Sequence, residues 1–371
     1  MIKPNTDILK WRFDISTFRL IGRELITDRI TALFELVKNC YDANSTLVEL
    51  EFHNVSSINK KSKIIIRDNG LGMSFEDIRD KWMVIGTASK RTELYSPEPF
   101  KRRYTGEKGI GRFAVDKLGD FVIIRTKKEG FDSLLNVNIS WSGFQENPDP
   151  ITSLKLFTDI ENIYSFETSE KSQHGTTIEI LEIRDIWTIK DLDRLYKELT
   201  KIVSPFYPLT PPFEIKVTSN EYTNFQQKRV ESEVIKFASH NASIIFKEDK
   251  QETLRFNEEK GEIYKDEIPL RSFGGIKMKL FFFDRNAKNA FRKHFKDEDR
   301  IDGIKIYRDG IITTPFAEYE NDRYKQRDVL GIDKRLWQDI FDKISTREVI
   351  GIVDITKEGN PKIIDATNRQ D

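Results

Sequence analysis

The feature that most constrains this fold is a predicted strand that ends in an acid and two glycines. Three consecutive isoleucines, at 64–66, favour a strand over residues 63–67, and Asp-Asn-Gly-Leu-Gly-Met follows at 68–73. Asn-Gly favours a two-residue hairpin, but Ser74, with Asp77 three residues later, predicts a capped helix that ends near Trp82 instead of a second strand. A strand that ends in this way allows the backbone to approach a ligand closely, with a carboxylate that accepts a hydrogen bond.

A helix is predicted over residues 24–44, before this strand. Its apolar stripe has helical spacing and consists of Ile30, Leu33, Phe34, Val37 and Tyr41. Glu35, Asn39 and Asp42 share the opposite face, at i, i+4 and i+7. Taken alone, these three residues are consistent with a solvated polar face, although an Asn inside a helix is a poor helix former. A further strand is predicted over 47–53.

A glycine-rich segment opens the next predicted helix, over 112–118. Its sequence, Gly-Glu-Lys-Gly-Ile-Gly at 106–111, allows the backbone N–H groups at a helix start to surround a phosphate. It differs from the Walker pattern, and no strand precedes it as the dinucleotide fingerprint requires. A flexible surface turn is the alternative for this segment taken alone.

Length and composition limit the possible classes of protein. The 371 residues predict two domains, with 38% hydrophobic and 33% charged residues. The charges of the 61 basic and 61 acidic residues cancel, so the formal net charge is zero. The whole chain therefore has no electrostatic attraction to nucleic acid or membrane. The single cysteine, Cys40, excludes an internal disulfide framework and a Cys-rich zinc site. Without a long apolar run or a hydrophobic signal core, the chain is expected to be soluble and cytoplasmic.

The Pro-rich stretch 204–212 is the predicted domain boundary, because it follows a predicted helix over 189–203 and cannot continue it. Strands are predicted before it at 121–126, 134–140, 154–158 and 176–181. The part after it is predicted to be mixed α/β, with strands near 234–246, 275–283, 303–307 and 349–354 and helices at 285–295 and 334–344. Arg308-Asp309-Gly310 is typical of a turn between two strands.

In order and separation, the elements at 35–43, 68–73 and 106–114 resemble the N, G1 and G2 boxes of the GHKL superfamily of Bergerat-fold ATPases. The resemblance extends to residues 85–90, similar to the start of the family's ATP lid, and to Gly175-Thr176 on a late strand. It implies a Bergerat-fold ATP-binding α/β sandwich over residues 1–205. A transducer-like (S5-type) mixed α/β domain would follow over 213–371, with a truncated C-terminal end.

The resemblance implies a role for each matching position. Glu35 would be the general base that activates water, Asn39 would hold Mg²⁺, and Asp68 would accept a hydrogen bond from the adenine amino group. Residues 86–111 would form a mobile lid. The base pocket would be lined by Asp42, Ala43, Gly72, Met73 and Thr176. The phosphates would be covered by residues 106–113 (Gly106, Lys108, Gly109, Ile110, Gly111, Arg112, Phe113), and Gly70, Gly86 and Lys90 would be further nucleotide contacts. Lys90 and Lys108 are equally consistent with solvated lysines.

Within the superfamily, the hydrolytic branch is favoured, with the greatest similarity to MORC-type and related bacterial ATPases. Only 34 residues precede Glu35, too few for the phospho-acceptor helical hairpin of a histidine kinase. The resemblance places a γ-phosphate-sensing basic residue in the transducer domain, and Arg369 is the candidate by position. A solvated chain terminus is the alternative for Arg369.

The resemblance therefore implies a Mg²⁺-dependent ATPase that closes its lid and forms a homodimer when ATP binds. A clamp or remodeller acting on DNA is the preferred function. A chaperone-like ATPase acting on protein clients and a slow nucleotide-gated scaffold are the alternatives.

Overall fold

The computed structural model describes residues 26, 28–84, 95–105, 114–141, 160–170, 173–203, 209, 211–231, 234–246, 251–256, 262–267, 274–295, 303–316, 348–356 and 358–360. The chain divides into two compact units, the first formed by residues 1–199 and 211–230, the second by residues 200–210 and 231–371. None of the helices in the described part has the length and apolar character that a membrane span requires.

The first unit contains an eight-stranded sheet in the order β5-β4-β3-β6-β2-β1-β7-β8. Its strands are antiparallel to their neighbours except at the β1–β7 pair, which is parallel. Their bounds are β1 Leu47–His53, β2 Lys63–Asp68, β3 Gly119–Lys127, β4 Ser133–Ser140, β5 Ile163–Thr168, β6 Gly175–Ile183, β7 Glu214–Ser219 and β8 Lys228–Arg229.

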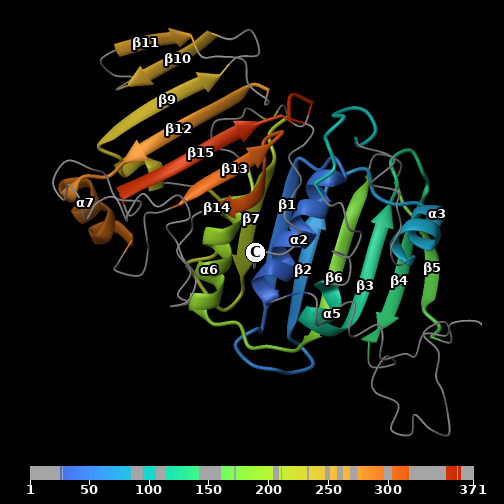
Figure 1. The fold of residues 1–371 in the computed structure, drawn as a ribbon. Helices are drawn as coiled ribbons and strands as arrows, with labels where there is room; N and C mark the ends of the chain where they lie inside the picture. Colours follow the sequence, from blue (N-terminus) through green and yellow to red (C-terminus); the bar gives the residue numbers. More distant parts are fainter. Residues whose placement is uncertain are drawn as a thin grey trace, which may run out of the picture. The chain divides into compact units, whose positions relative to one another are not determined.

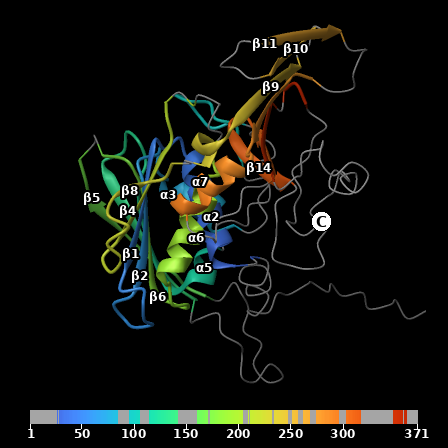
Figure 2. The ribbon, with the colours of Figure 1, turned by 90° about the vertical axis from the view of Figure 1, so that its left-hand side faces the viewer.

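Helices cover one face of this sheet. They are α2 (Arg29–Asp42), α5 (Ala114–Leu118) and α6 (Ile189–Leu199), which Figures 1 and 2 show on the same side of the strands. Val48, Leu50 and Phe52 of β1 point into the core beneath them and are fully buried. The alternation of buried and partly exposed residues along β1 is the period of two expected of a strand with one covered face.

Helix α2 begins later than predicted, at Arg29, because the Asp28 side chain caps it by accepting a hydrogen bond of 2.8 Å from the Thr31 N–H. Its predicted apolar stripe is confirmed as buried, and Ala32, Leu36 and Cys40 are buried as well. Asp42, predicted on the polar face, is also buried. The helix is therefore enclosed on more sides than a single amphipathic stripe requires.

The capped helix after β2 is confirmed. Ser74 and Asp77 form a reciprocal capping box at the start of α3 (Phe75–Asp77), and a π-helix, Ile78–Trp82, continues it. Hydrogen bonds from Lys128 and Ser74 to the Asp77 carboxyl outweigh its burial and hold its pKa well below the usual range.

The second unit contains a seven-stranded sheet in the order β11-β10-β9-β12-β15-β13-β14. The strands are β9 His240–Phe246, β10 Gln251–Phe256, β11 Glu262–Glu267, β12 Ile276–Phe282, β13 Ile304–Arg308, β14 Ile311–Phe316 and β15 Val349–Ile355, with a 3₁₀ helix at Val234–Phe237 and α7 at Arg285–Phe295. The predicted turn between β13 and β14 is confirmed, and Asp309 (φ 53°) and Gly310 (φ 87°) both have positive φ, as in a type I′ hairpin.

The two units divide the chain differently from the predicted boundary. Strand β7 pairs parallel with β1, with Leu47 opposite Glu214, so residues 211–230 belong to the first unit, whereas the prediction began the second domain at 213. The reason is that the chain returns to the first sheet after the Pro-rich stretch. The strand predicted at 154–158 and the helix predicted at 334–344 lie outside the described residues.

Candidate functional site

The predicted site residues that the structure describes lie in three parts of the first unit: α2 from its middle to its C-cap, the end of β2 with the turn that follows, and the start of β6. The other predicted residues lie outside the described part of the chain: Gly86, Lys90, Gly106, Lys108, Gly109, Ile110, Gly111, Arg112, Phe113 and Arg369. The described ones are Glu35, Asn39, Asp42, Ala43, Asp68, Gly70, Gly72, Met73 and Thr176.

The α2 end of the site contains a partly accessible acid with a cation beside it. The side chain of Glu35 is 31% exposed, and its Oε1 lies 3.4 Å from Nζ of Lys38. Asn39 follows Glu35 by one helical turn and is also partly exposed. Residues at i and i+4 share a face of a helix, so the structure presents this acid and this amide side by side.

The turn at residues 68–73 is attached directly to the C-terminal end of α2. The Leu71 N–H donates to the Ala43 carbonyl at 2.8 Å, and a Cβ on Gly70 would lie 2.4 Å from the same oxygen. Only glycine allows this approach. The residues predicted as the N and G1 boxes are therefore brought into contact.

The remaining residues of the turn are fixed by bonds to the neighbouring strands. The Asn69 Oδ1 atom accepts from the N–H groups of Thr46 and Leu47 at 2.9 Å each, which ties the turn to the start of β1. Gly72 has a φ of +66°, and a Cβ there would lie 1.9 Å from the Lys127 carbonyl. The position therefore requires glycine on both counts.

Asp68 is the last residue of β2, opposite Thr176 of β6. Burial raises the pKa of its carboxyl to about 6, while hydrogen bonds from the Gly70 N–H, the Cys40 thiol and the Thr176 N–H, together with the charge of His174, limit the rise. Burial and the adjacent Asp68 likewise raise the pKa of the Cys40 thiol. Asp68 keeps some solvent exposure, so it is a partly desolvated carboxylate. With a pKa of about 6 it is mostly ionised at neutral pH, which suits it to accept hydrogen bonds.

The start of β6 completes this polar cluster. His174 Nδ1 lies 2.6 Å from the Gly70 carbonyl oxygen. The hydroxyls of Thr126 and Thr176 are hydrogen-bonded at 2.9 Å, and the Thr126 hydroxyl also accepts from the Met73 N–H at 2.8 Å. Thr176 was predicted near the base, whereas Thr126 and His174 were not predicted; the signal available for His174 was its position directly before Gly175-Thr176.

Residues 95–105 are part of the predicted mobile lid. The structure anchors this segment to the end of α2. Asp42 Oδ1 accepts from both the N–H and the hydroxyl of Thr105, at 2.8 and 2.9 Å. The Asn44 side chain donates to the Pro97 carbonyl at 2.8 Å and accepts from the Ser96 hydroxyl at 2.5 Å. Asn44 has a φ of 61°, a conformation that Asn adopts more readily than most residues.

Arg102 is the central residue of this anchor, and the sequence did not predict its role. Its guanidinium donates to the carbonyls of Ser45 and Tyr41 and lies 4.5 Å from the centre of the Tyr41 ring. The residue is 7% exposed, and burial lowers the pKa of the guanidinium. No periodic pattern marks Arg102, because its partners are mainly backbone carbonyls distant in sequence.

The residues on both sides of the glycine-rich segment are fixed next to α2. On one side, Thr105 is bonded to Asp42. On the other, α5 packs against α2, and Arg184 holds it by donating to Asp116 Oδ1 at 3.0 Å and to the Asp116 carbonyl at 2.8 Å. The described residues that flank the segment predicted to bind phosphates thus lie beside the helix that contains Glu35 and Asn39.

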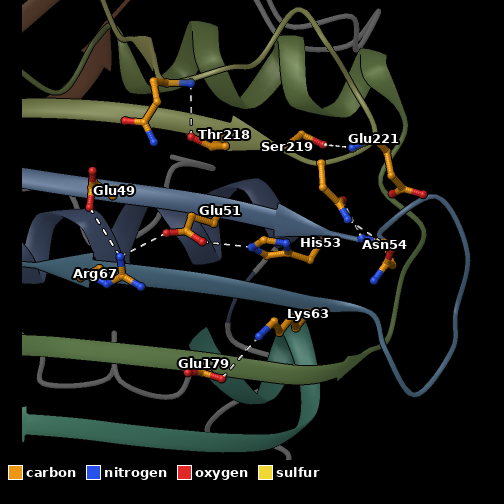
Figure 3. Close-up of polar contacts among 12 residues, drawn as sticks. Glu49, Glu51, His53, Asn54, Lys63, Arg67, Glu179, Thr218, Ser219 and Glu221 are labelled. Carbon is orange, nitrogen blue, oxygen red and sulfur yellow. Dashed lines mark hydrogen bonds and ion pairs between the residues drawn. The ribbon is translucent and has the colours of Figure 1, made fainter.

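The opposite face of the sheet has a different chemistry (Figure 3). Arg67 lies 3.7 Å from Glu49 and 3.3 Å from Glu51, and His53 lies 3.0 Å from Glu51. These strand residues face solvent and pair with one another, which is the ordinary arrangement of charges on an open sheet face. Substitutions on this face can therefore serve as matched controls for substitutions in the site.

Comparison with known proteins agrees with this geometry. Residues 27–176 match the family described as histidine kinase-, DNA gyrase B-, and HSP90-like ATPase. This range contains every described residue predicted to be in the site.

Relatives resemble this chain over restricted regions. The chaperone protein HtpG of Buchnera aphidicola subsp. Acyrthosiphon pisum (strain APS) is 27% identical over 198 residues, 48% of this chain and 30% of HtpG. HgiDII of Herpetosiphon aurantiacus, named as a candidate type II restriction enzyme, is 27% identical over 118 residues, 32% of this chain and 18% of that protein. The chain therefore spans less than a third of the length of these relatives.

Proposed function

Because residues 27–176 belong to the GHKL family of ATPase domains, we propose that the chain binds ATP in its first unit and hydrolyses it with Mg²⁺. The observation that carries this proposal is the attachment of the 68–73 turn to the end of α2 through the Leu71–Ala43 bond. This contact joins a mostly ionised, partly desolvated carboxylate to a helix that presents a second acid and an amide.

Adenine is the base that this pocket suits. The adenine amino group is a donor, and the Asp68 carboxylate is an acceptor whose pKa of about 6 leaves it ionised at neutral pH. Guanine presents a carbonyl oxygen at the equivalent position, which the carboxylate would repel. Ala43, Gly70, Gly72, Met73 and Thr176 would contact the base, while Asp42, through its bonds to Thr105, would hold segment 95–105 beside the pocket.

The phosphates would extend along α2 toward Glu35. Eight residues separate Glu35 from Ala43, which is about 12 Å along a helix axis and comparable with the separation of the base and terminal phosphate in an extended ATP. Asn39 lies between them, and its side-chain oxygen is a ligand type that Mg²⁺ accepts alongside phosphate oxygens and water. Glu35 would orient and deprotonate the attacking water.

The charge near Glu35 is consistent with this role. Lys38 Nζ lies 3.4 Å from Glu35 Oε1, and the Lys38 side chain is only 14% exposed. This ion pair would therefore restrict the orientation of the Glu35 carboxylate.

On the macromolecular target, we favour an ATP-gated clamp or remodeller acting on DNA, in which ATP binding closes the 86–111 lid and drives homodimerisation. Arg369 would sense the γ-phosphate from the second unit. The match to HtpG supports a second candidate, a chaperone-like ATPase that acts on protein clients. The match to HgiDII, which is named as a candidate type II restriction enzyme, is consistent with a DNA-directed role.

One set of measurements tests these proposals. Steady-state ATP hydrolysis by the 371-residue chain is measured with and without Mg²⁺, then with duplex DNA at two salt concentrations or with an unfolded client protein. Size-exclusion chromatography with a non-hydrolysable ATP analogue reports dimerisation. DNA stimulation that decreases with salt supports the clamp, stimulation by the client alone supports the chaperone, and an absence of ATP binding contradicts both.

A further inference from the structure

His174 is the residue of the site whose contact suggests a role beyond those assigned above. It directly precedes β6, and its Nδ1 lies 2.6 Å from the carbonyl oxygen of Gly70, 104 residues earlier in the chain. A carbonyl oxygen only accepts hydrogen bonds, so Nδ1 must be the protonated ring nitrogen. Both the neutral Nδ1–H tautomer and the imidazolium make this bond.

This bond holds Gly70, the residue of the turn whose N–H donates to the Asp68 carboxylate. The Gly70 N–H donates to Asp68 Oδ1 at 2.8 Å, and the Gly70 carbonyl accepts from His174. Glycine has two dihedral angles with little steric restriction, so these bonds and the contact with Ala43 set its conformation. The Gly70 carbonyl and the Leu71 N–H belong to one peptide plane, which the bonds to His174 and Ala43 fix from both sides. Fixing this plane restricts the movement of the adjoining plane, which carries the N–H that holds Asp68.

We propose that His174 is a positioning residue of the base pocket: its Nδ1–H bond to the Gly70 carbonyl holds the turn in the orientation in which Asp68 receives the adenine amino group. This inference rests on the proposed ATP-binding function. It adds a residue of β6 that acts on the base through the turn.

The charge of His174 adds a second effect on Asp68. The groups that face this carboxyl are the Cys40 thiol from α2, the Gly70 N–H from the turn, and the Thr176 N–H and His174 from the start of β6. Of these, only His174 can carry a positive charge, and that charge, when present, lowers the pKa of Asp68 against the effect of burial. Loss of the imidazole should therefore raise the pKa of Asp68 further.

The choice of substitution separates the two effects. Asn places its amide nitrogen close to the position of Nδ1, so His174→Asn keeps a donor for Gly70 but removes the titratable charge. Gln places its amide nitrogen near the position of Nε2, so His174→Gln removes the donor at the correct position. His174→Leu removes both. His53→Asn, on the open face of the sheet (Figure 3), is the matched control.

The test is calorimetric titration of the intact chain and these variants with β,γ-imido-ATP between pH 5.5 and 8. At pH 7.5 we expect His174→Leu and His174→Gln to bind about tenfold more weakly, since a carbonyl loses its donor, and His174→Asn and His53→Asn to bind within about twofold of wild type. Wild-type affinity should fall below about pH 6, and in His174→Asn this fall should begin at a higher pH.

The outcomes distinguish this inference from the function on which it rests. Equal affinity of His174→Gln and His174→Asn, with wild type binding normally, would overturn the role of His174 and leave the ATP site intact. The Gln–Asn comparison remains decisive if His174→Leu does not fold. Failure of wild type to bind the analogue would instead remove the proposed function, and this inference with it.

Discussion

The two faces of the eight-stranded sheet use charged residues in opposite ways. On the open face, Arg67 pairs with both Glu49 and Glu51 of the adjacent strand. At the strand ends next to α2, Asp68 is partly desolvated and receives hydrogen bonds from several elements, which leaves its pKa at about 6. Ion pairs that are exposed to solvent contribute little to folding stability. A desolvated carboxylate lowers the stability of the free protein, and a ligand that donates a hydrogen bond to it can offset this loss. This difference supports our proposal that the functional part is the rim beside α2, formed by Asp68, the turn at 68–73 and the start of β6.

The largest expected effect is on catalysis. Glu35→Ala should reduce the rate of ATP hydrolysis by about 10²–10⁴-fold, the usual contribution of a general base, while the affinity for a non-hydrolysable analogue stays within about twofold. The control is Glu51→Ala on the open face, which should hydrolyse ATP at the wild-type rate. Unchanged turnover in Glu35→Ala would remove Glu35 as the base.

Asp68→Asn should stabilise the nucleotide-free protein, by about 1–3 kcal/mol at pH 7. The folded-state pKa of Asp68 is raised from 3.8 to about 6, so the folded state binds the proton more tightly than the unfolded state. The wild-type free energy of unfolding should therefore decrease as pH rises from about 4 to about 6, and the variant should lack this contribution.

Urea unfolding at pH 5 and pH 7.5 measures this difference. Glu49→Gln, a charge-matched change on the open face, should change the free energy of unfolding by no more than about 0.5 kcal/mol. A destabilised Asp68→Asn at pH 7.5 would show that the carboxylate is not strained by burial.

Arg102→Leu tests the anchor between segment 95–105 and α2. The carbonyls of Ser45 and Tyr41 lose a charged donor, so we expect a loss of about 1–3 kcal/mol in stability and weaker ATP binding. Arg125→Leu is the control, because Arg125 pairs with Glu179 on the open face. Equal effects of the two substitutions on both quantities would contradict a special role for the anchor.

The smallest effect is expected on the open face itself. Arg67 is 48% exposed, and exposed ion pairs contribute about 0.2–1 kcal/mol. Arg67→Ala should therefore lower the free energy of unfolding by less than about 1 kcal/mol, less so at high salt, with unchanged ATP affinity. A loss of ATP affinity in this variant would show that the open face contributes to the site.

Local sequence patterns were sufficient for the elements that position the site. The strand predicted over 47–53 is β1 with the same bounds, and the cap at Ser74 is present as predicted. These features depend on residues close in sequence, namely an alternation of buried positions and a Ser–Asp pair three residues apart. The contact between the 35–43 and 68–73 segments was predicted only through the family resemblance.

Long-range contacts were beyond the sequence. Arg102 bonds to carbonyls about 60 residues earlier and His174 to one 104 residues earlier. All three acceptors are backbone carbonyls, which residue type does not mark. The return of β7 to the first sheet was missed for a similar reason, since parallel pairing with β1 depends on a crossover that no local pattern specifies. The roles of the individual site residues remain predictions.

The most direct test of the account is a titration of β,γ-imido-ATP into wild type, Asp68→Asn and Glu49→Gln at pH 7.5. The account predicts that wild type and Glu49→Gln bind equally, and that Asp68→Asn binds at least about tenfold more weakly, because a charged hydrogen bond to the base is lost. Equal binding by Asp68→Asn and wild type would contradict the placement of the base at the rim beside α2.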